Sequence, residues 1–144
     1  HRTAHICIYN SCGKILLQKR ASRKDLLPDM WDISVAGHIG TSDTEISAAV
    51  REISEEIGVE VNESDLDFYK VFKFSGTYNN LINNEFFYVY FLKLDLNLKD
   101  LILQVEEVSD IDWFSCEDIL NNSIDNLVEQ IYWEELILKV KSFK

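Results

Sequence analysis

The chain has 144 residues, of which 47% are hydrophobic. This length and composition suit a single globular domain over residues 1–144, and the formal net charge of −11 opposes binding to nucleic acid. The longest apolar run, Phe86–Leu92, is far shorter than the ~20 residues that a membrane helix needs, so no membrane association is expected.

The first part of the chain is predicted to consist of strands. Residues Thr3–Asn10 alternate in polarity, and Lys14–Lys19 follows a turn signal, so the two segments predict a β-hairpin. A polar loop is expected over Arg20–Asp29. Residues Trp31–Ile39 are then expected to be extended and to end in a glycine-containing turn.

The strongest helical pattern follows this turn. Ser42 and Glu45 have the S-x-x-E spacing of a capping box, which satisfies free N–H groups at a helix start. The apolar positions then recur at helical spacing, at Ile46, Ala49, Val50, Ile53 and Ile57. Gly58 is the expected C-terminal stop, so the pattern predicts a helix over about Asp43–Ile57.

The second half of the chain alternates strands and helices. Two strands are predicted at Asp67–Phe74 and Glu85–Leu94, joined by the Asn-rich loop Tyr78–Asn84. The later predicted elements are a short strand, a brief helix and a terminal amphipathic helix, at Asp110–Phe114, Cys116–Asn121 and Asp125–Lys141. This order predicts an α/β or α+β fold with a mixed β-sheet sandwiched between helices.

Residues 51–58 read REISEEIG and carry three glutamates on the predicted helix. At about 100° per residue, Glu52, Glu55 and Glu56 share one face beside the apolar stripe. A solvated surface is one interpretation, because acidic helix faces are common. A cation site is the other, because Mg²⁺ prefers carboxylate oxygens and would relieve their mutual repulsion.

The spacing around these glutamates resembles the Nudix box, G-x(5)-E-x(7)-R-E-U-x-E-E-x-G-U, in which U is aliphatic. The residues that match by identity are Gly37, Arg51, Glu52, Glu55, Glu56 and Gly58. Asp43 stands where the family has Glu, and it is one methylene shorter. The resemblance implies the Nudix fold. It also implies hydrolysis of a diphosphate linkage in a nucleoside diphosphate derivative or another organic diphosphate.

The resemblance also implies roles for the residues of the box. The implied ligands of Mg²⁺ or Mn²⁺ are Glu52, Glu55, Glu56 and the carbonyl of Gly37. The implied structural residues are Asp43, Arg51 and Gly58, with Asp43 bracing the helix against Arg51. Such a metal neutralises the diphosphate, whose charge otherwise repels a nucleophile, and it reconciles an acidic protein with an anionic substrate.

The residue that acts as the catalytic base varies within this family. Some members use a box glutamate, here Glu55 or Glu56, and others use a carboxylate from a later strand or loop. Glu85, which opens the predicted strand after the Asn-rich loop, is the candidate from outside the box. An ordinary charge at the edge of a strand is the alternative interpretation of Glu85.

The upstream stretch LLQKRASRKDLLPDMWDISVAGH resembles a Nudix branch that contains isopentenyl-diphosphate isomerase and hydrolase-like relatives. The isomerases place a catalytic cysteine just before the equivalents of Gly37 and His38, where this chain has Ala36. Ala36 can neither donate nor accept a proton, so the sequence favours hydrolysis over isomerisation. A non-catalytic ligand-binding Nudix domain is a further alternative, which the three intact glutamates disfavour.

Several polar side chains are candidates for binding the substrate. The candidate phosphate contacts are Lys19, Arg20, Lys24 and His38. Solubilising charge is the alternative for the three cations, and capping of the turn is the alternative for His38. His5 alternates with apolar residues in its strand and is expected to be structural.

The three cysteines are scattered and contain no CxxC pair, so they indicate neither a zinc site nor a disulfide framework. With no signal-peptide pattern at the start, the sequence favours the reducing cytoplasm. The chain lacks an initiator Met and begins almost inside a strand, so we expect it to lack a short N-terminal segment. The oligomeric state stays open, with a homodimer among the alternatives.

Overall fold

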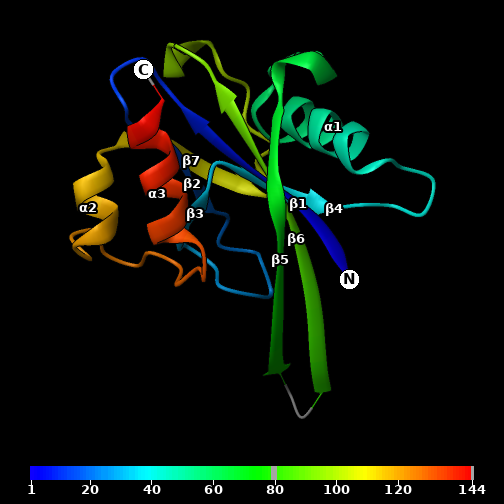
Figure 1. Ribbon diagram of the computed structural model, residues 1–144. Coiled ribbons are helices and arrows are strands. Elements are labelled where there is room, and N and C mark those ends of the chain that lie inside the picture. The colour runs from blue at the N-terminus through cyan, green and yellow to red at the C-terminus, as the bar shows by residue number, and fades with distance from the viewer. Residues whose placement is uncertain (79–80, 144) are drawn as a thin grey trace.

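A computed structural model describes residues 1–78 and 81–143 and shows a mixed β-sheet between helices (Figure 1). The strands are β1 (Arg2–Tyr9), β2 (Ile15–Arg20), β3 (Trp31–Ile33), β4 (Val35–His38), β5 (Asp67–Tyr78), β6 (Leu81–Lys93) and β7 (Val108–Phe114). The helices are α1 (Glu45–Ile57), α2 (Cys116–Leu120) and α3 (Trp133–Ser142), and short 3₁₀ helices span Glu63–Asp65 and Leu98–Asp100. Helix α1 lies on one side of the sheet, and α2 and α3 lie on the other (Figure 1).

Strand β1 is at the centre of the sheet. The strand order is β3-β2-β1-β6-β5, with β4 paired to β1 and β7 paired to β2. The predicted hairpin forms, but β1 and β2 are paired only at Tyr9 and Ile15. Beyond that pair, β1 continues with β4 and β6, whereas β2 continues with β3 and β7. The two strands therefore diverge.

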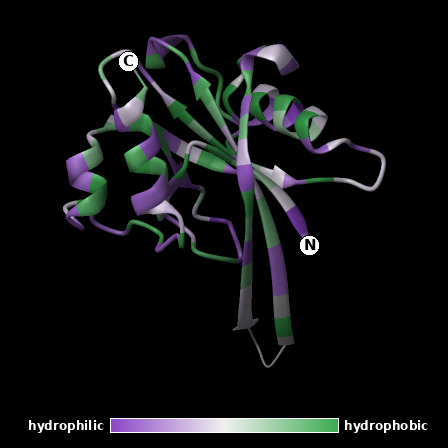
Figure 2. Cartoon of the chain, viewed as in Figure 1, coloured by the Kyte–Doolittle hydropathy of each residue, from purple (hydrophilic) through white to green (hydrophobic). Residues whose placement is uncertain are grey.

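The alternation of side chains along β1 gives the sheet two cores. Ala4, Ile6 and Ile8 belong to the core under α1, whereas Cys7 and Tyr9 belong to the core under α2 and α3. A strand that buries both faces needs helices on both sides. Figure 2 shows hydrophobic residues along the central strands and on the helices beside them. The predicted mixed sheet between helices is confirmed.

Helix α1 starts later than predicted, at Glu45, and the predicted capping box of Ser42 and Glu45 is wrong. The N-cap is Thr44, whose backbone is extended. Its hydroxyl accepts the Ser47 N–H at 3.1 Å, and the Ser47 hydroxyl accepts the Thr44 N–H at 3.0 Å. The helix ends where predicted, because Gly58 adopts a left-handed conformation with φ of 71°.

The predicted Asn-rich loop over Tyr78–Asn84 is also wrong. Strand β5 runs to Tyr78 and β6 begins at Leu81, while Asn79 and Asn80 lie outside the described residues. Asparagine is disfavoured in strands, but here the backbone pairing between β5 and β6 outweighs that preference. The two strands extend beyond the rest of the molecule as a long arm (Figure 1).

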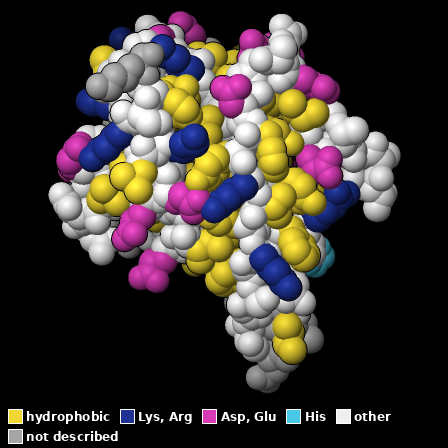
Figure 3. Space-filling view, viewed as in Figure 1, with side chains coloured by type: hydrophobic (Ala, Val, Ile, Leu, Met, Phe, Trp, Pro, Cys, Tyr) yellow, Lys and Arg dark blue, Asp and Glu magenta, His cyan; other side chains and the backbone are white. Residues whose placement is uncertain are grey.

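Strand β5 lies at one edge of the sheet and is lined by apolar side chains. Phe68, Val71 and Phe74 on this strand are substantially exposed. In Figure 3, hydrophobic side chains gather along this part of the surface, with basic side chains between them. Strand β5 therefore presents an apolar surface where it runs beside the body of the protein.

The predicted terminal helix starts later than expected, at Trp133 rather than Asp125. The preceding residues lie along the edge of β3 instead. The Trp31 N–H donates to the Asn126 carbonyl at 2.8 Å, and the Val128 N–H donates to the Trp31 carbonyl at 2.9 Å. These bonds, together with the positive φ of 60° at Asn126, hold this segment out of a helix. No helix in the described ranges is long and apolar enough to cross a membrane.

Candidate active site

The glutamate face of α1 packs against β4 and β2. Glu56 is 4% exposed, and its Oε1 accepts a hydrogen bond from Gln18 Nε2 at 2.9 Å. The Glu52 carboxylate lies against the backbone of Gly37, where an added Cβ would lie 2.1 Å from Glu52 Cδ. Only glycine at this position lets β4 and the glutamates come this close.

This packing makes ionisation of the two inner glutamates unfavourable. Burial raises the pKa of Glu56 to about 8, and the nearby charge of Glu52 adds to the effect. Burial also raises the pKa of Glu52, with a further contribution from Glu55. The carboxylates are therefore crowded and poorly solvated, a situation that a bound cation would relieve.

Arg51 links α1 to the turn that precedes it. Its Nη2 donates to Asp43 Oδ2 at 3.0 Å and to the His38 carbonyl at 3.2 Å. Its Nη1 donates to Glu52 at 2.8 Å and lies 3.5 Å from Glu55. The contact between Asp43 and Arg51 that the resemblance implies is present, although Asp43 is one methylene shorter than the glutamate of the family. The Gly40 N–H, followed by Arg51, lowers the pKa of Asp43.

The glutamates line a pocket of about 680 Å³. The predicted site residues that line it are Arg20, Lys24, Gly37, His38, Arg51, Glu52, Glu55, Glu56 and Glu85. Glu85 lies inside β6, paired with Phe74 of β5, and does not open a strand as predicted. Lys19 does not line the pocket. Asp43 and Gly58 also lie outside it, Asp43 in the ion pair with Arg51 and Gly58 at the C-cap of α1.

The two remaining cations of the pocket are already engaged. Lys24 forms an ion pair with Glu107 from the loop before β7. Arg20 donates through Nε to the Leu26 carbonyl at 3.1 Å. Arg20 therefore keeps part of its guanidinium for other groups, whereas Lys24 would have to exchange Glu107 for a phosphate.

Several residues of the site were missed from the sequence, among them Thr3, Asp32 and Gln130, which line the pocket, and Gln18, which binds Glu56. Gln18 and Asp32 are buried polar residues within apolar strands, which is the one signal that could have found them. Thr3 Oγ1 is buried and has no hydrogen-bond partner among the described residues. Such a hydroxyl is available to a bound oxygen or nitrogen.

The carboxylates offer hard oxygen ligands of the kind that Mg²⁺ and Mn²⁺ take. Within residues 1–78 and 81–143, however, no three His, Cys, Asp or Glu side chains form a group that could hold a metal ion. Arg51 contacts Glu52 and Glu55, and Gln18 binds Glu56. The donor chemistry thus fits a divalent cation, while Arg51 holds two of the three carboxylates.

Comparison with known proteins agrees with this geometry. The NUDIX domain family matches residues 1–132. An uncharacterized Nudix hydrolase of Listeria innocua is 33% identical over 119 residues, which cover 83% of this chain and 66% of that protein. The chain thus spans under two thirds of the length of that relative.

Two further similar proteins are relevant to the fold of this chain and to the branch of the family that it resembles. Isopentenyl-diphosphate Delta-isomerase 2 of Photorhabdus laumondii is 31% identical over 143 residues, covering 95% of this chain and 75% of that protein. The crystal structure of DR0079 from Deinococcus radiodurans is 26% identical with a TM-score of 0.71, covering 96% of this chain and 82% of that one.

Proposed function

The chain belongs to the NUDIX domain family, and we propose that it is a hydrolase that cleaves a diphosphate linkage with Mg²⁺ or Mn²⁺. The observation that carries this proposal is the set of three box glutamates beside Gly37 in one pocket. The proposed substrate is a nucleoside diphosphate derivative or another organic diphosphate. The many hydrolases of this family generally use divalent metals.

The proposed ligands are the carboxylates of Glu52, Glu55 and Glu56 and the carbonyl of Gly37. When bound, the metal neutralises charge on the diphosphate and polarises a P–O bond. The desolvation of Glu56 supports this assignment, because a buried carboxylate that lacks a cationic partner is costly. Arg51 would release Glu52 and Glu55 to the ion while Asp43 and the His38 carbonyl continue to hold its Nη2.

The remaining residues act on the water and the phosphates. Water attacks one phosphorus, the P–O bond to the other phosphoryl group breaks, and a carboxylate takes the proton of the water. Glu55, Glu56 and Glu85 are the proposed bases, because all three line the pocket. Arg20, with His38 and Lys24, would contact the phosphate oxygens.

A screen of diphosphate compounds with Mg²⁺ or Mn²⁺ tests the proposal. Nucleoside diphosphate derivatives and other organic diphosphates are incubated with the protein, and the released phosphate-containing products are measured. We expect turnover of at least one compound. No turnover across the whole panel with either metal would reject the proposal in favour of a ligand-binding role.

Isomerisation is the second candidate, and the likeness to the Photorhabdus isomerase favours it. Ala36 argues against it, because this residue stands at the position of the isomerase cysteine and has no titratable group. His38 lies two residues along the same strand, about 6–7 Å further on, which is too far to replace a side chain at position 36.

We therefore expect no interconversion of isopentenyl and dimethylallyl diphosphate. The measurement is proton NMR of either compound in heavy water with Mg²⁺ and the protein, following deuterium at the allylic carbons. An authentic isomerase under the same conditions is the positive control. Steady incorporation at enzyme-like rates would make the isomerase interpretation the better one.

A further inference from the structure

Strand β3 contributes a buried carboxylate to the same pocket. Asp32 is 6% exposed, and its Oδ1 accepts two hydrogen bonds, from the Ile33 N–H at 2.7 Å and from Gln130 Nε2 at 2.9 Å. Its Oδ2 lies 3.8 Å from Arg20 Nη1, which is longer than a hydrogen bond. Oδ1 of Asp32 thus accepts two hydrogen bonds, whereas among the described residues Oδ2 accepts none, and the Asp32 side chain lines the pocket.

A segment that is distant in the sequence helps to hold this carboxylate in place. Gln130 lies 98 residues from Asp32 in the sequence and reaches it through the segment that runs along β3. Trp31 anchors that segment by bonding Asn126 on one side and Val128 on the other. The orientation of Asp32 is therefore fixed before any ligand arrives, as a site that reads hydrogen bonds requires.

His5 does not neutralise Asp32. Burial, followed by the charge of Arg20, lowers the pKa of His5 to about 3, so the imidazole is neutral near pH 7. His5 Nδ1 is instead paired with the hydroxyl of the buried Tyr132 at 2.6 Å. Among the residues that line the described pocket, Arg20 is the cation that the structure pairs with Asp32.

The pocket also has a wall of aromatic rings. His5 stacks on Phe87 at 4.3 Å between centroids and an angle of 23°. Phe74 lies nearly parallel to Phe87, at 6.3 Å and 13°, and is 41% exposed. Flat rings can stack on such surfaces, whereas a flexible alkenyl chain would gain only the burial of its apolar surface.

Building on the proposed hydrolysis, we propose that Asp32 determines specificity by accepting a hydrogen bond from the amino group of a planar heterocycle in the organic half of the substrate. An alkenyl diphosphate offers no donor, so it would leave Oδ2 of the buried Asp32 without a hydrogen bond from the substrate. Sites built to bond a polar group strongly reject analogues that lack it.

The test is a binding measurement with nucleoside monophosphates, which contain no diphosphate linkage to hydrolyse. AMP is compared with purine riboside 5′-monophosphate, and GMP with IMP, by calorimetry in the presence of Mg²⁺. The members of each pair differ in a single amino group. In at least one pair we expect the amino-bearing nucleotide to bind about 10-fold more tightly or better.

The variant Asp32→Asn should abolish this difference. The two donors at Oδ1 hold the amide oxygen there, so the amide nitrogen takes the place of Oδ2 and presents a donor instead of an acceptor. Asp25→Asn is the matched control, because Asp25 is exposed in the neighbouring loop and does not line the pocket. This control should keep the wild-type preference.

Equal affinities within both pairs for the wild type would overturn the inference, and this comparison holds even if Asp32→Asn fails to fold. A preference that persists in a folded Asp32→Asn would also overturn it. Either result, together with turnover in the diphosphate screen, leaves the proposed hydrolysis standing. Absence of turnover in the screen would instead reject the hydrolysis itself.

Discussion

Replacing Glu56 by Gln is expected to lower the rate of diphosphate hydrolysis by about 10²-fold or more. Glutamine keeps the shape of the side chain and can still accept the hydrogen bond from Gln18. It cannot supply a negative charge or accept a proton, and loss of one preorganised electrostatic group typically has an effect of this size. The measurement is the steady-state rate with the best compound from the screen.

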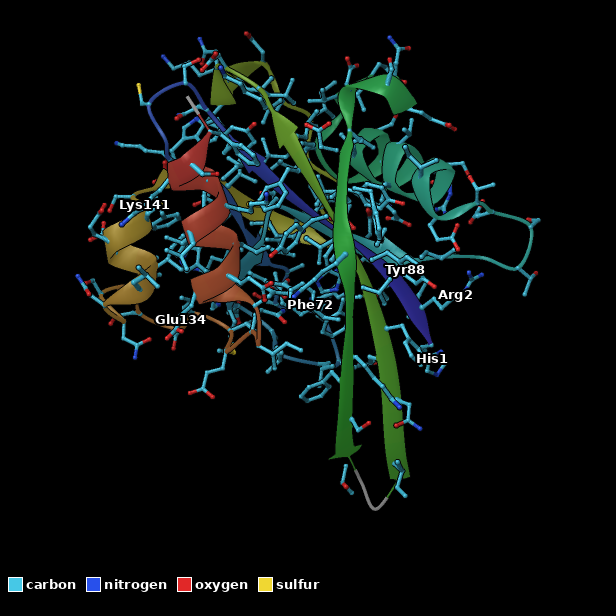
Figure 4. The ribbon with its side chains drawn as sticks, in the orientation of Figure 1. His1, Arg2, Phe72, Tyr88, Glu134 and Lys141 are labelled. Atoms are coloured by element: carbon cyan, nitrogen blue, oxygen red, sulfur yellow. The ribbon has the colours of Figure 1, made fainter. Side chains whose placement is uncertain are left out.

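Folding should survive this substitution. Glu56 is buried beside Glu52, so a neutral side chain removes a repulsion, and the melting temperature without metal should stay unchanged or rise. Glu134→Gln is the matched control, because Glu134 is exposed on α3, away from α1 (Figure 4). Near-normal turnover by a folded Glu56→Gln would contradict a catalytic or metal-binding role for this buried carboxylate.

Removal of divalent metal is expected to abolish turnover. The substrate is an anion and the chain carries a formal charge of −11, so the three glutamates would repel it without a cation. Activity is measured in excess chelator and again after Mg²⁺ or Mn²⁺ is added in excess over the chelator. The first rate should fall to background and the second should recover.

A control separates metal removal from direct inhibition by the chelator. Chelator that has been saturated with Mg²⁺ beforehand should leave the rate unchanged. Full turnover in excess free chelator would contradict the metal-dependent mechanism, and the glutamates would then need another role.

The features of this protein that could be predicted from the sequence are those that depend on the spacing of residues close together in the chain. Glu52, Glu55 and Glu56 fall on one helix face because their spacing matches the helical repeat, and the Gly58 stop follows from its left-handed backbone. The order of strands and helices likewise predicts a mixed sheet between helices, and the structure has one core on each face of β1.

The errors arise where tertiary contacts overrule local preference. Pairing with β5 keeps Asn83 and Asn84 in a strand, although asparagine favours turns. The bonds of Trp31 to Asn126 and Val128 delay the terminal helix. The contact between Asp32 and Gln130 could not be predicted from the sequence, because it joins residues that only the folded chain brings together.

Hydrolysis in water enriched with ¹⁸O tests the central claim most directly. The wild-type protein is incubated with Mg²⁺ and a diphosphate that it turns over, and the products are analysed by mass spectrometry. We predict one ¹⁸O atom in one phosphate-containing product for each cleavage, because water attacks phosphorus and a P–O bond breaks. Label attached to carbon, or no cleavage of any diphosphate offered, would contradict the assignment of this site.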